Sequence, residues 1–464
     1  MKKFALVVAA TFLWMAITAF GVEKSHDEEI CAVTTALKEV QKTSGKLLLS
    51  GRLDESISIM VARFPKETRT GIEAFMLGNA LFEIDQKISY AMHKEAFEKL
   101  PSYPNAALEW AMEQHRVGEH TGALAAYDTY TKTNPNFAPV HGLAADCLIR
   151  LGKIPEACAR WKKSEEATRG TIATLESLVC DIYKNSSFHR QRAELRSKAE
   201  MGDAEAAAKL VLLDGTYEHD WWNAAPHMPY LESDIPLLEK LPEGTARKAL
   251  ECASKLFLQR GSKTEEQEAE KDKVSKERVE TLLKKYGFFF DSQQTLPPDG
   301  GTLSLMLGAA MDANLLKIED ARKLFGPALL KRAATSHDAE LHNVLANIFA
   351  KTPEMESVEK KGWEATGDAR FAAGYLIELM SNGKLKKESP ELLAALKQFP
   401  ENSVITRIVM GLTPEPDQEL LVRAIKSEFR KFSPSALYAG TDVNLRPRAT
   451  ALRRYFALLT KLQK

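Results

Sequence analysis

The chain has 464 residues, longer than a single ordinary hydrophobic core, so we expect two or three domains or one long solenoid. Hydrophobic residues make up 44% and charged residues 27%, a balance that argues against global disorder. Basic and acidic residues number 63 each, and the resulting zero net charge argues against a nucleic-acid partner, which requires a basic surface.

The first residues have the pattern of a secretory signal. Two lysines precede an uninterrupted apolar run from Phe4 to Phe20, and Ala19-Phe20-Gly21 has the small-x-small form that signal peptidase requires. We interpret residues 1–21 as a signal peptide, with the mature chain starting near Val22, and expect an exported protein, periplasmic or secreted. The alternative is an uncleaved membrane anchor, because the run is about as long as the shortest membrane-spanning helices.

The cysteines form neither a disulfide framework nor a metal motif. An odd, sparse set in a long chain is not a disulfide scaffold. Cys147 and Cys158 fall on the two helices of one predicted pair, so a bridge between them is geometrically conceivable; we favour small buried hydrophobes instead. No CxxC or Cys/His spacing indicates zinc, and we expect no metal site and no cofactor. The five cysteines are Cys31, Cys147, Cys158, Cys180 and Cys252.

The N-terminal part of the chain is predicted to form two helix pairs. Between Asp27 and Pro65, Gly51 interrupts a stripe of apolar residues and marks the turn between two helices. Between Gly71 and Leu100, Leu77-Gly78 and Leu81 place a small residue and its apolar neighbours on one helical face.

The stretch from Pro104 to Thr171 contains one pattern twice in the same register. Its period, roughly 34 residues, is typical of a helix–turn–helix repeat. Glycine suits the tight turn between the helices, alanine lets the paired helices approach closely, and an aromatic residue packs as the large side chain of the second helix. The recurring pairs are Gly118 and Gly152, Ala111 and Ala145, Ala123 and Ala157, and Tyr127 and Trp161.

These residues resemble the tetratricopeptide repeat (TPR) family. Two units match well, two upstream units match loosely, and residues 171–206 form a further degenerate unit. Trp110 replaces a leucine, and Gln114 and Leu148 stand where a tyrosine is usual, which weakens any assignment to a subfamily. The resemblance implies a right-handed superhelix whose first helices line a concave binding face. Carried over by register, the binding positions are Asn79, Phe82, Met112, His115, Arg116, Asp146 and Arg150.

Beyond Gly202 the repeat register is lost, but the pattern stays helical. Asp203 has the character of an N-cap for an alanine-rich helix, and the sequence from Pro297 to Gly301 is the best candidate for a domain boundary. A basic amphipathic helix from Leu445 to Leu462 suits a solenoid cap.

No segment alternates between apolar and polar residues as a strand does, so the expected fold is all-α. The expected parts are a signal peptide (1–21), a TPR-like array (22–206), an irregular helical region with a charged segment (207–296) and a C-terminal helical-repeat array (302–464). The two arrays either form one superhelix or hinge at Pro297-Pro298.

The sequence contains no nucleophile elbow, HExxH motif, P-loop, dinucleotide fingerprint or EF-hand loop, and we expect no catalytic residues. Residues 218–222 and His227 bring imidazoles and carboxylates close together, but an aromatic plug over a repeat end explains the same residues. The charged run from Thr264 to Glu280 is interpreted as a solvated helix or loop, with electrostatic contact to a partner as the alternative.

The sequence therefore predicts an exported TPR-like scaffold that binds a protein or peptide partner in the cell envelope. Asn79, Arg116 and Arg150 are candidates to hydrogen-bond a peptide carboxylate or backbone, against the alternative of ordinary solvated surface. Two other functions stay open: a glycan-processing envelope enzyme, which needs an acidic pair in a cleft, and a purely structural envelope component. Membrane contact is expected only through an uncleaved N-terminal segment, and the oligomeric state is not predicted.

Overall fold

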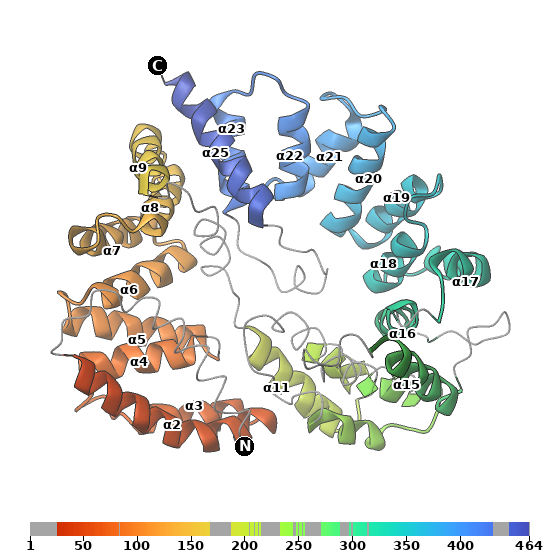
Figure 1. Ribbon diagram of the computed structural model, residues 1–464, viewed down its shortest axis with the longest axis horizontal. Coiled ribbons are helices and arrows are strands. Elements are labelled where there is room, and N and C mark those ends of the chain that lie inside the picture. The colour runs from red at the N-terminus through yellow and green to blue at the C-terminus, as the bar shows by residue number, and fades with distance from the viewer. Residues whose placement is uncertain are drawn as a thin grey trace. The chain divides into compact units, whose positions relative to one another are not determined.

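In the residues that the computed structural model describes, the regular elements are helices, and none of these residues forms a strand (Figure 1). The all-α prediction is confirmed. Residues 1–21, 171–186, 218–222 and 227 lie outside the described residues, so the signal peptide, the first part of the last degenerate unit and the aromatic loop stay predictions. None of the described helices combines the length and the apolar composition needed to cross a membrane. The described residues are 26–82, 84–167, 187–203, 205–207, 209–211, 213–214, 233–244, 247–248, 250–252, 254–255, 271–287, 297, 300–312, 315–429 and 445–463.

Many described helices pack against a neighbour in the chain, and short turns join the two helices of several pairs. In the N-terminal part they are α2 (Asp27–Leu49), α3 (Leu53–Ala62), α4 (Gly71–Leu81), α5 (Gln86–Lys99), α6 (Pro104–Val117), α7 (His120–Thr133), α8 (Ala138–Arg150), α9 (Ile154–Ala167) and α11 (Ser187–Glu200). They continue as the 3₁₀ helix η1 (Ile235–Lys240), α15 (Lys271–Lys285), α16 (Gly300–Asp312), α17 (Ile318–Ala333), α18 (Ala339–Ile348), α19 (Met355–Thr366), α20 (Ala369–Ser381), α21 (Pro390–Gln398), α22 (Ser403–Gly411), α23 (Gln418–Glu428) and α25 (Leu445–Leu462).

Three consecutive helix pairs, α4–α5, α6–α7 and α8–α9, keep one register (Figure 1). Their second helices begin at Gln86, His120 and Ile154, one repeat period apart each time, and each is 14 residues long. The regular period therefore covers three helix pairs, one more than the two with clear sequence matches. These helix pairs make the described N-terminal region a TPR-type helical-repeat fold.

The turn glycines end the first helices as predicted. Gly118 and Gly152 have φ angles of 88° and 73°, a conformation that a side chain with a Cβ adopts only with strain. At Gly118 the backbone N–H donates to the carbonyl of His115, and the next N–H, from Glu119, donates to that of Gln114. This pair of bonds satisfies carbonyls that a helix end otherwise leaves without partners, and it stops the helix there.

Polar side chains fix where several helices begin. Thr70 and Glu73 form a reciprocal capping box at the start of α4. Asp85, Asp338 and Asn402 accept backbone N–H groups at the starts of α5, α18 and α22. The sequence therefore specifies the starts of these helices locally, independently of how the helices pack.

The predicted small and large core positions are buried. Ala111, Ala123, Ala145 and Ala157 have no exposed surface, and Tyr127 is also fully covered. Small side chains at the contact let the two helices of a pair approach, and the aromatic ring fills the space between successive pairs. Trp161 occupies the position of Tyr127 in the next repeat and is 2% exposed.

The chain divides into two compact units, and the domains expected from the sequence stay a prediction. One unit contains α2 to α9, the start of α11, and also α22, α23 and α25. The other contains the rest of α11 and the elements from η1 to α21. The physical reason is a shared core: apolar residues of α8 and α9 pack with Leu421 and Ile425 of α23 and with Tyr455 and Phe456 of α25. Burial of these faces groups residues 400–464 with the N-terminal helices in one compact unit.

The expected linker from Pro297 to Gly301 is helical at its end. Gly300 and Gly301 begin α16, and the N–H of Gly300 donates to Oδ2 of Asp338 over 2.7 Å. A Cβ at Gly300 would overlap the backbone nitrogen of Leu341. This glycine therefore permits close packing of α16 on α18, which is a different role from that of a flexible joint.

Several smaller predictions are confirmed. Oδ1 of Asp203 accepts the N–H groups of Glu205 and Ala206, which is the expected N-cap. The helix α25 has the predicted bounds. The described end of the charged run lies in α15, where Lys284 and Glu280 form an exposed ion pair. The described cysteines are free thiols; Cys147, Cys158 and Cys252 are buried, and no bridge joins the first two.

Candidate partner-binding face

The predicted binding positions lie near the C-terminal ends of three successive first helices. Asn79 lies in α4 with Phe82 directly after it, Met112, His115 and Arg116 lie in α6, and Asp146 and Arg150 lie in α8. Phe82, Arg116 and Arg150 occupy equivalent positions in the three repeats. Figure 1 shows the pairs α4–α5, α6–α7 and α8–α9 stacked in chain order. The structure therefore brings the seven residues to one edge of the array.

Two of the seven are buried, and the other five are partly exposed. His115 and Asp146 are 2% and 0% exposed. Asn79, Phe82, Met112, Arg116 and Arg150 are intermediate. A partner can therefore touch the five partly exposed residues directly, whereas His115 and Asp146 affect a partner only through the residues that they contact. Whether the positions bind a peptide stays a prediction.

One buried polar network connects α4, α5 and α6. His93 lies between two acceptors, with Nε2 3.0 Å from Oδ1 of Asn79 and Nδ1 3.2 Å from Oε1 of Glu113. Ser89 donates to the same oxygen of Glu113 over 2.7 Å. Asn79 is therefore held with its oxygen toward His93, and its buried amide nitrogen has no hydrogen-bond partner among the described residues.

Glu113 orients Arg116, the central residue of the predicted face. Nε of Arg116 donates to Oε2 of Glu113 over 2.9 Å, and Nη1 donates to Oε1 of Gln86 over 2.7 Å. Burial alone would raise the pKa of Glu113, but the hydrogen bond and charge of His93, with Arg116, outweigh burial and lower the pKa. The carboxylate is therefore ionised at neutral pH and keeps the guanidinium in place.

A second buried network repeats this arrangement one unit later. Nε2 of His115 lies 2.7 Å from Oδ2 of Asp146, and Nδ1 lies 3.2 Å from the hydroxyl of Tyr127. Burial would raise the pKa of Asp146, but hydrogen bonding to His115 and the charge of Arg150 lower it. This network joins α6, α7 and α8 through polar atoms in the same region where alanines bring the helices close.

Arg150 extends the second network to the main chain of another helix. Its Nε donates to Oδ2 of Asp146 over 2.8 Å, and its Nη2 lies 3.5 Å from the carbonyl oxygens of both Lys426 and Phe429. Those carbonyls are at the C-terminal end of α23, where a helix leaves carbonyls without intrahelical partners. This position of the repeat therefore already binds polypeptide backbone within the chain.

Sequence reasoning missed most members of these networks. His93 occupies the repeat position that holds Tyr127 and Trp161 in the next two units, so extending the register upstream would have identified it as the large side chain of its repeat. Glu113 is equivalent to Asn79 by the same rule. The pairing itself had no sequence signal, because it depends on side-chain directions across three helices.

No family model matches the chain, and no curated protein matches it. The solved structures that match include the TPR domain of P58(IPK), with 13% identity over 85% of this chain and 99% of that chain and a TM-score of 0.21. Tom70 from yeast matches with 13% identity over 94% of this chain and 97% of that chain, with a TM-score of 0.27. A chain in the structure of Naa15/Naa10 bound to HypK-THB matches with 14% identity over 100% of this chain and 76% of that chain, with a TM-score of 0.24. At these scores the matches carry no argument, and the repeat fold rests on the register of α4 to α9.

Proposed function

We propose that the protein is an exported TPR-type scaffold that binds a protein or peptide partner in the cell envelope. The observation that carries the proposal is the contact of Arg150 with the carbonyls of Lys426 and Phe429. In this contact a side chain of the repeat array binds polypeptide backbone within the same chain. The equivalent position holds Phe82 and Arg116 in the two preceding repeats. Export is supported by the apolar run and small-residue pattern of residues 1–21.

The equivalent position one repeat earlier is the one we assign to the partner. Arg116 is held by Glu113 and Gln86, and its side chain is 11% exposed. A guanidinium fixed in this way offers its remaining N–H to a carbonyl or carboxylate with little loss of conformational freedom. Met112, one turn earlier in α6, supplies a partly exposed apolar contact beside it.

The binding test compares two arginines in the full chain. Arg116→Gln keeps a polar side chain beside Glu113 but removes the cation, while Arg63→Gln removes a 47% exposed cation from the end of α3. We expect Arg116→Gln to reduce the recovery of a specific partner in pull-downs from intact envelopes, and Arg63→Gln to leave it unchanged. Arg150 is unsuitable for this test because its substitution also breaks the contact with α23.

Two results would count against the proposal. One is an unchanged set of partners for Arg116→Gln with the helical content intact. The other is release of soluble sugar fragments from envelope glycans by the purified protein without a stable partner, which supports the enzyme instead. Mass spectrometry of the protein recovered from the envelope tests export separately, and we expect a mature N-terminus at Val22.

A further inference from the structure

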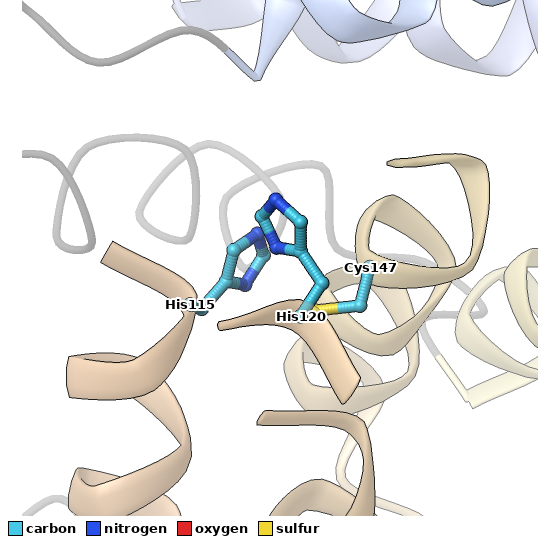
Figure 2. Close-up of side chains that lie close together, drawn as sticks. All are labelled: His115, His120 and Cys147. Carbon is cyan, nitrogen blue, oxygen red and sulfur yellow. The ribbon is translucent and has the colours of Figure 1, made fainter. Parts of the chain in front are cut away.

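Three side chains with metal-binding atoms meet at the junction of α6, α7 and α8. His115 is in the last turn of α6, His120 is the first residue of α7, and Cys147 is in α8 (Figure 2). One ligand atom from each residue lies within 4.8 Å of the others. Figure 2 shows the two imidazoles and the sulfur converging from three separate helices.

Asp146 sets the ring of His115 in the orientation of a metal ligand. Because Oδ2 of Asp146 is 2.7 Å from Nε2, the proton of the neutral ring lies on Nε2 and the lone pair lies on Nδ1. Histidines that bind metals usually donate their other N–H to a carboxylate in this way, which fixes the tautomer and strengthens the ligand. Nδ1 now accepts from the hydroxyl of Tyr127 over 3.2 Å, so a metal would replace a long hydrogen bond.

His120 supplies the second nitrogen. Its ring lies 5.5 Å from that of His115, nearly perpendicular to it, and its Nδ1 is buried with no hydrogen-bond partner among the described residues. Burial, followed by the charges of His115 and Arg150, lowers the pKa of His120 to about 4; Asp146 opposes this effect and Lys426 adds to it. Because no hydrogen bond among the described residues occupies Nδ1, a metal binds this nitrogen without displacing one.

Cys147 supplies the sulfur. It is a free thiol with no exposed surface, and it follows Asp146 directly in the chain. Burial is the main cause that raises the pKa of this thiol, so the protonated form is the stable one without a metal. A bound divalent cation provides the charge that a buried thiolate needs.

We propose that His115, His120 and Cys147 bind one Zn²⁺ ion. Two imidazole nitrogens and one thiolate are typical ligands for this borderline-soft ion, and the fourth position of a tetrahedron is left for water. On binding, the S–H bond of Cys147 breaks, a Zn–S bond forms, and the proton passes to the solvent. No electron is transferred.

The present separations suit such a site after a small contraction. Zinc bonds of about 2.0–2.3 Å place tetrahedral ligand atoms about 3.5 Å apart, which is about 1.3 Å less than the 4.8 Å within which these three atoms lie. His120 is only partly buried and begins its helix, so its side chain is the one that moves. The ion would connect two repeats directly beneath the partner-binding face. This inference is independent of the proposed function.

The test uses the full chain purified without chelator and without an immobilised-metal step. Elemental analysis is expected to find one zinc per chain, and Co²⁺ put in its place is expected to give the thiolate-to-metal charge-transfer absorption and the visible bands of a tetrahedral site. Cys147→Ser is expected to abolish the charge-transfer absorption, and His120→Asn to weaken Zn²⁺ binding by at least about tenfold in a chelator competition.

Matched controls separate ligand loss from damage to the fold. Cys158→Ser changes another buried free thiol, in α9, and His141→Asn changes a histidine in α8 that lies outside the cluster and whose Nε2 bonds to the carbonyl of Pro135. Both are expected to bind Zn²⁺ like the unchanged chain. The proposal is overturned if the full chain binds no zinc, or if Co²⁺ binds without the thiolate absorption. It is also overturned if Cys147→Ser and His120→Asn retain the affinity of their controls.

Discussion

Glu359 on α19 is a buried carboxyl whose stability contribution depends on pH. It is 7% exposed, its Oε2 has no hydrogen-bond partner among the described residues, and a Cβ at Gly374 of α20 would lie 2.5 Å from its Oε1. Burial, with the charge of Glu378 as a smaller cause, raises its pKa from the ordinary 4.5 to about 7. The folded chain therefore favours the protonated form of this carboxyl.

The sign of the effect follows from the raised pKa. The contribution of the Glu359 carboxyl to the free energy of unfolding is fully present below about pH 4.5. As the pH rises through about 7, this contribution is lost, and the free energy of unfolding falls by about 3 kcal/mol. We expect Glu359→Gln to gain stability relative to the unchanged chain between pH 5 and pH 8, measured by urea unfolding. Glu364→Gln, at a 62% exposed position of the same helix, is the control. A stability difference for Glu359→Gln that stays constant with pH would contradict the raised pKa.

A substitution at Gly118 tests the cost of backbone strain without any steric overlap. Its φ is 88° and an added Cβ would meet nothing within 4 Å, so Gly118→Ala introduces strain alone. We expect a loss of about 1 kcal/mol in the free energy of unfolding. Gly411, the last residue of α22, also has open space around an added Cβ but lacks the positive φ. Gly411→Ala is therefore expected to be neutral or slightly stabilising, and the same loss for both variants would rule out the strain argument.

At the scale of residues, the sequence predicted the positions that depend on local chemistry. Gly118, Gly152 and the small alanines follow from what a turn or a close helix contact accepts. His93 and Glu113 were missed because their pairing joins positions far apart in the chain and belongs to a network across three helices. The same limit explains why a zinc site was not expected: the spacing of His115, His120 and the distant Cys147 matches no standard ligand motif.

At the scale of elements, an aromatic stack joins α25 to α9. Phe456 of α25 and Trp161 of α9 lie face to face, with ring centroids 4.5 Å apart and planes 7° from parallel, and they are 1% and 2% exposed. We expect Phe456→Ala to destabilise the chain by about 3–5 kcal/mol, because it removes a large buried side chain and leaves a cavity.

The readout is the rate of amide hydrogen exchange in α9 and α25, which is expected to rise together in both helices. Leu462→Ala changes a 54% exposed residue at the end of the same helix and is expected to change stability by less than about 0.5 kcal/mol. Faster exchange in α25 with no change in α9 would mean that the stack does not couple them.

The bounds of α25 were predictable because its apolar residues recur at helical spacing within one short stretch. The helix against which α25 packs was not predictable. Trp161 and Phe456 lie in distant parts of the chain, and an amphipathic pattern states that a face will be buried without stating against what. The repeats α6–α7 and α8–α9 were predictable in both respects, since a repeat packs against its sequence neighbour.

At the scale of the whole molecule, the composition and the repeat period were sufficient for the fold class, and the division into domains stays a prediction. The charged and glycine-rich stretches near residues 264–301 suggested a division into N-terminal and C-terminal arrays. The compact units group α22, α23 and α25 with α2 to α9. Proline and glycine patterns indicate the local backbone conformation, whereas the boundary of a compact unit depends on which apolar helix faces pack together.

This grouping predicts how the chain responds to loss of its C-terminal residues. Deleting residues 400–464 removes the helices that cover α8 and α9 and exposes Trp161 and Leu148 to water. In a repeat array each pair is stabilised mainly by its neighbours, so the loss should diminish along the array. We expect amide exchange to increase most in α8 and α9, less in α6 and α7, and least in α4 and α5.

The helices α17 to α19, which belong to the other unit, serve as the internal control and should keep their exchange rates. A uniform increase across α4 to α9 would instead mean that these repeats unfold as one cooperative block, and no increase in α8 and α9 would mean that the C-terminal helices do not stabilise them.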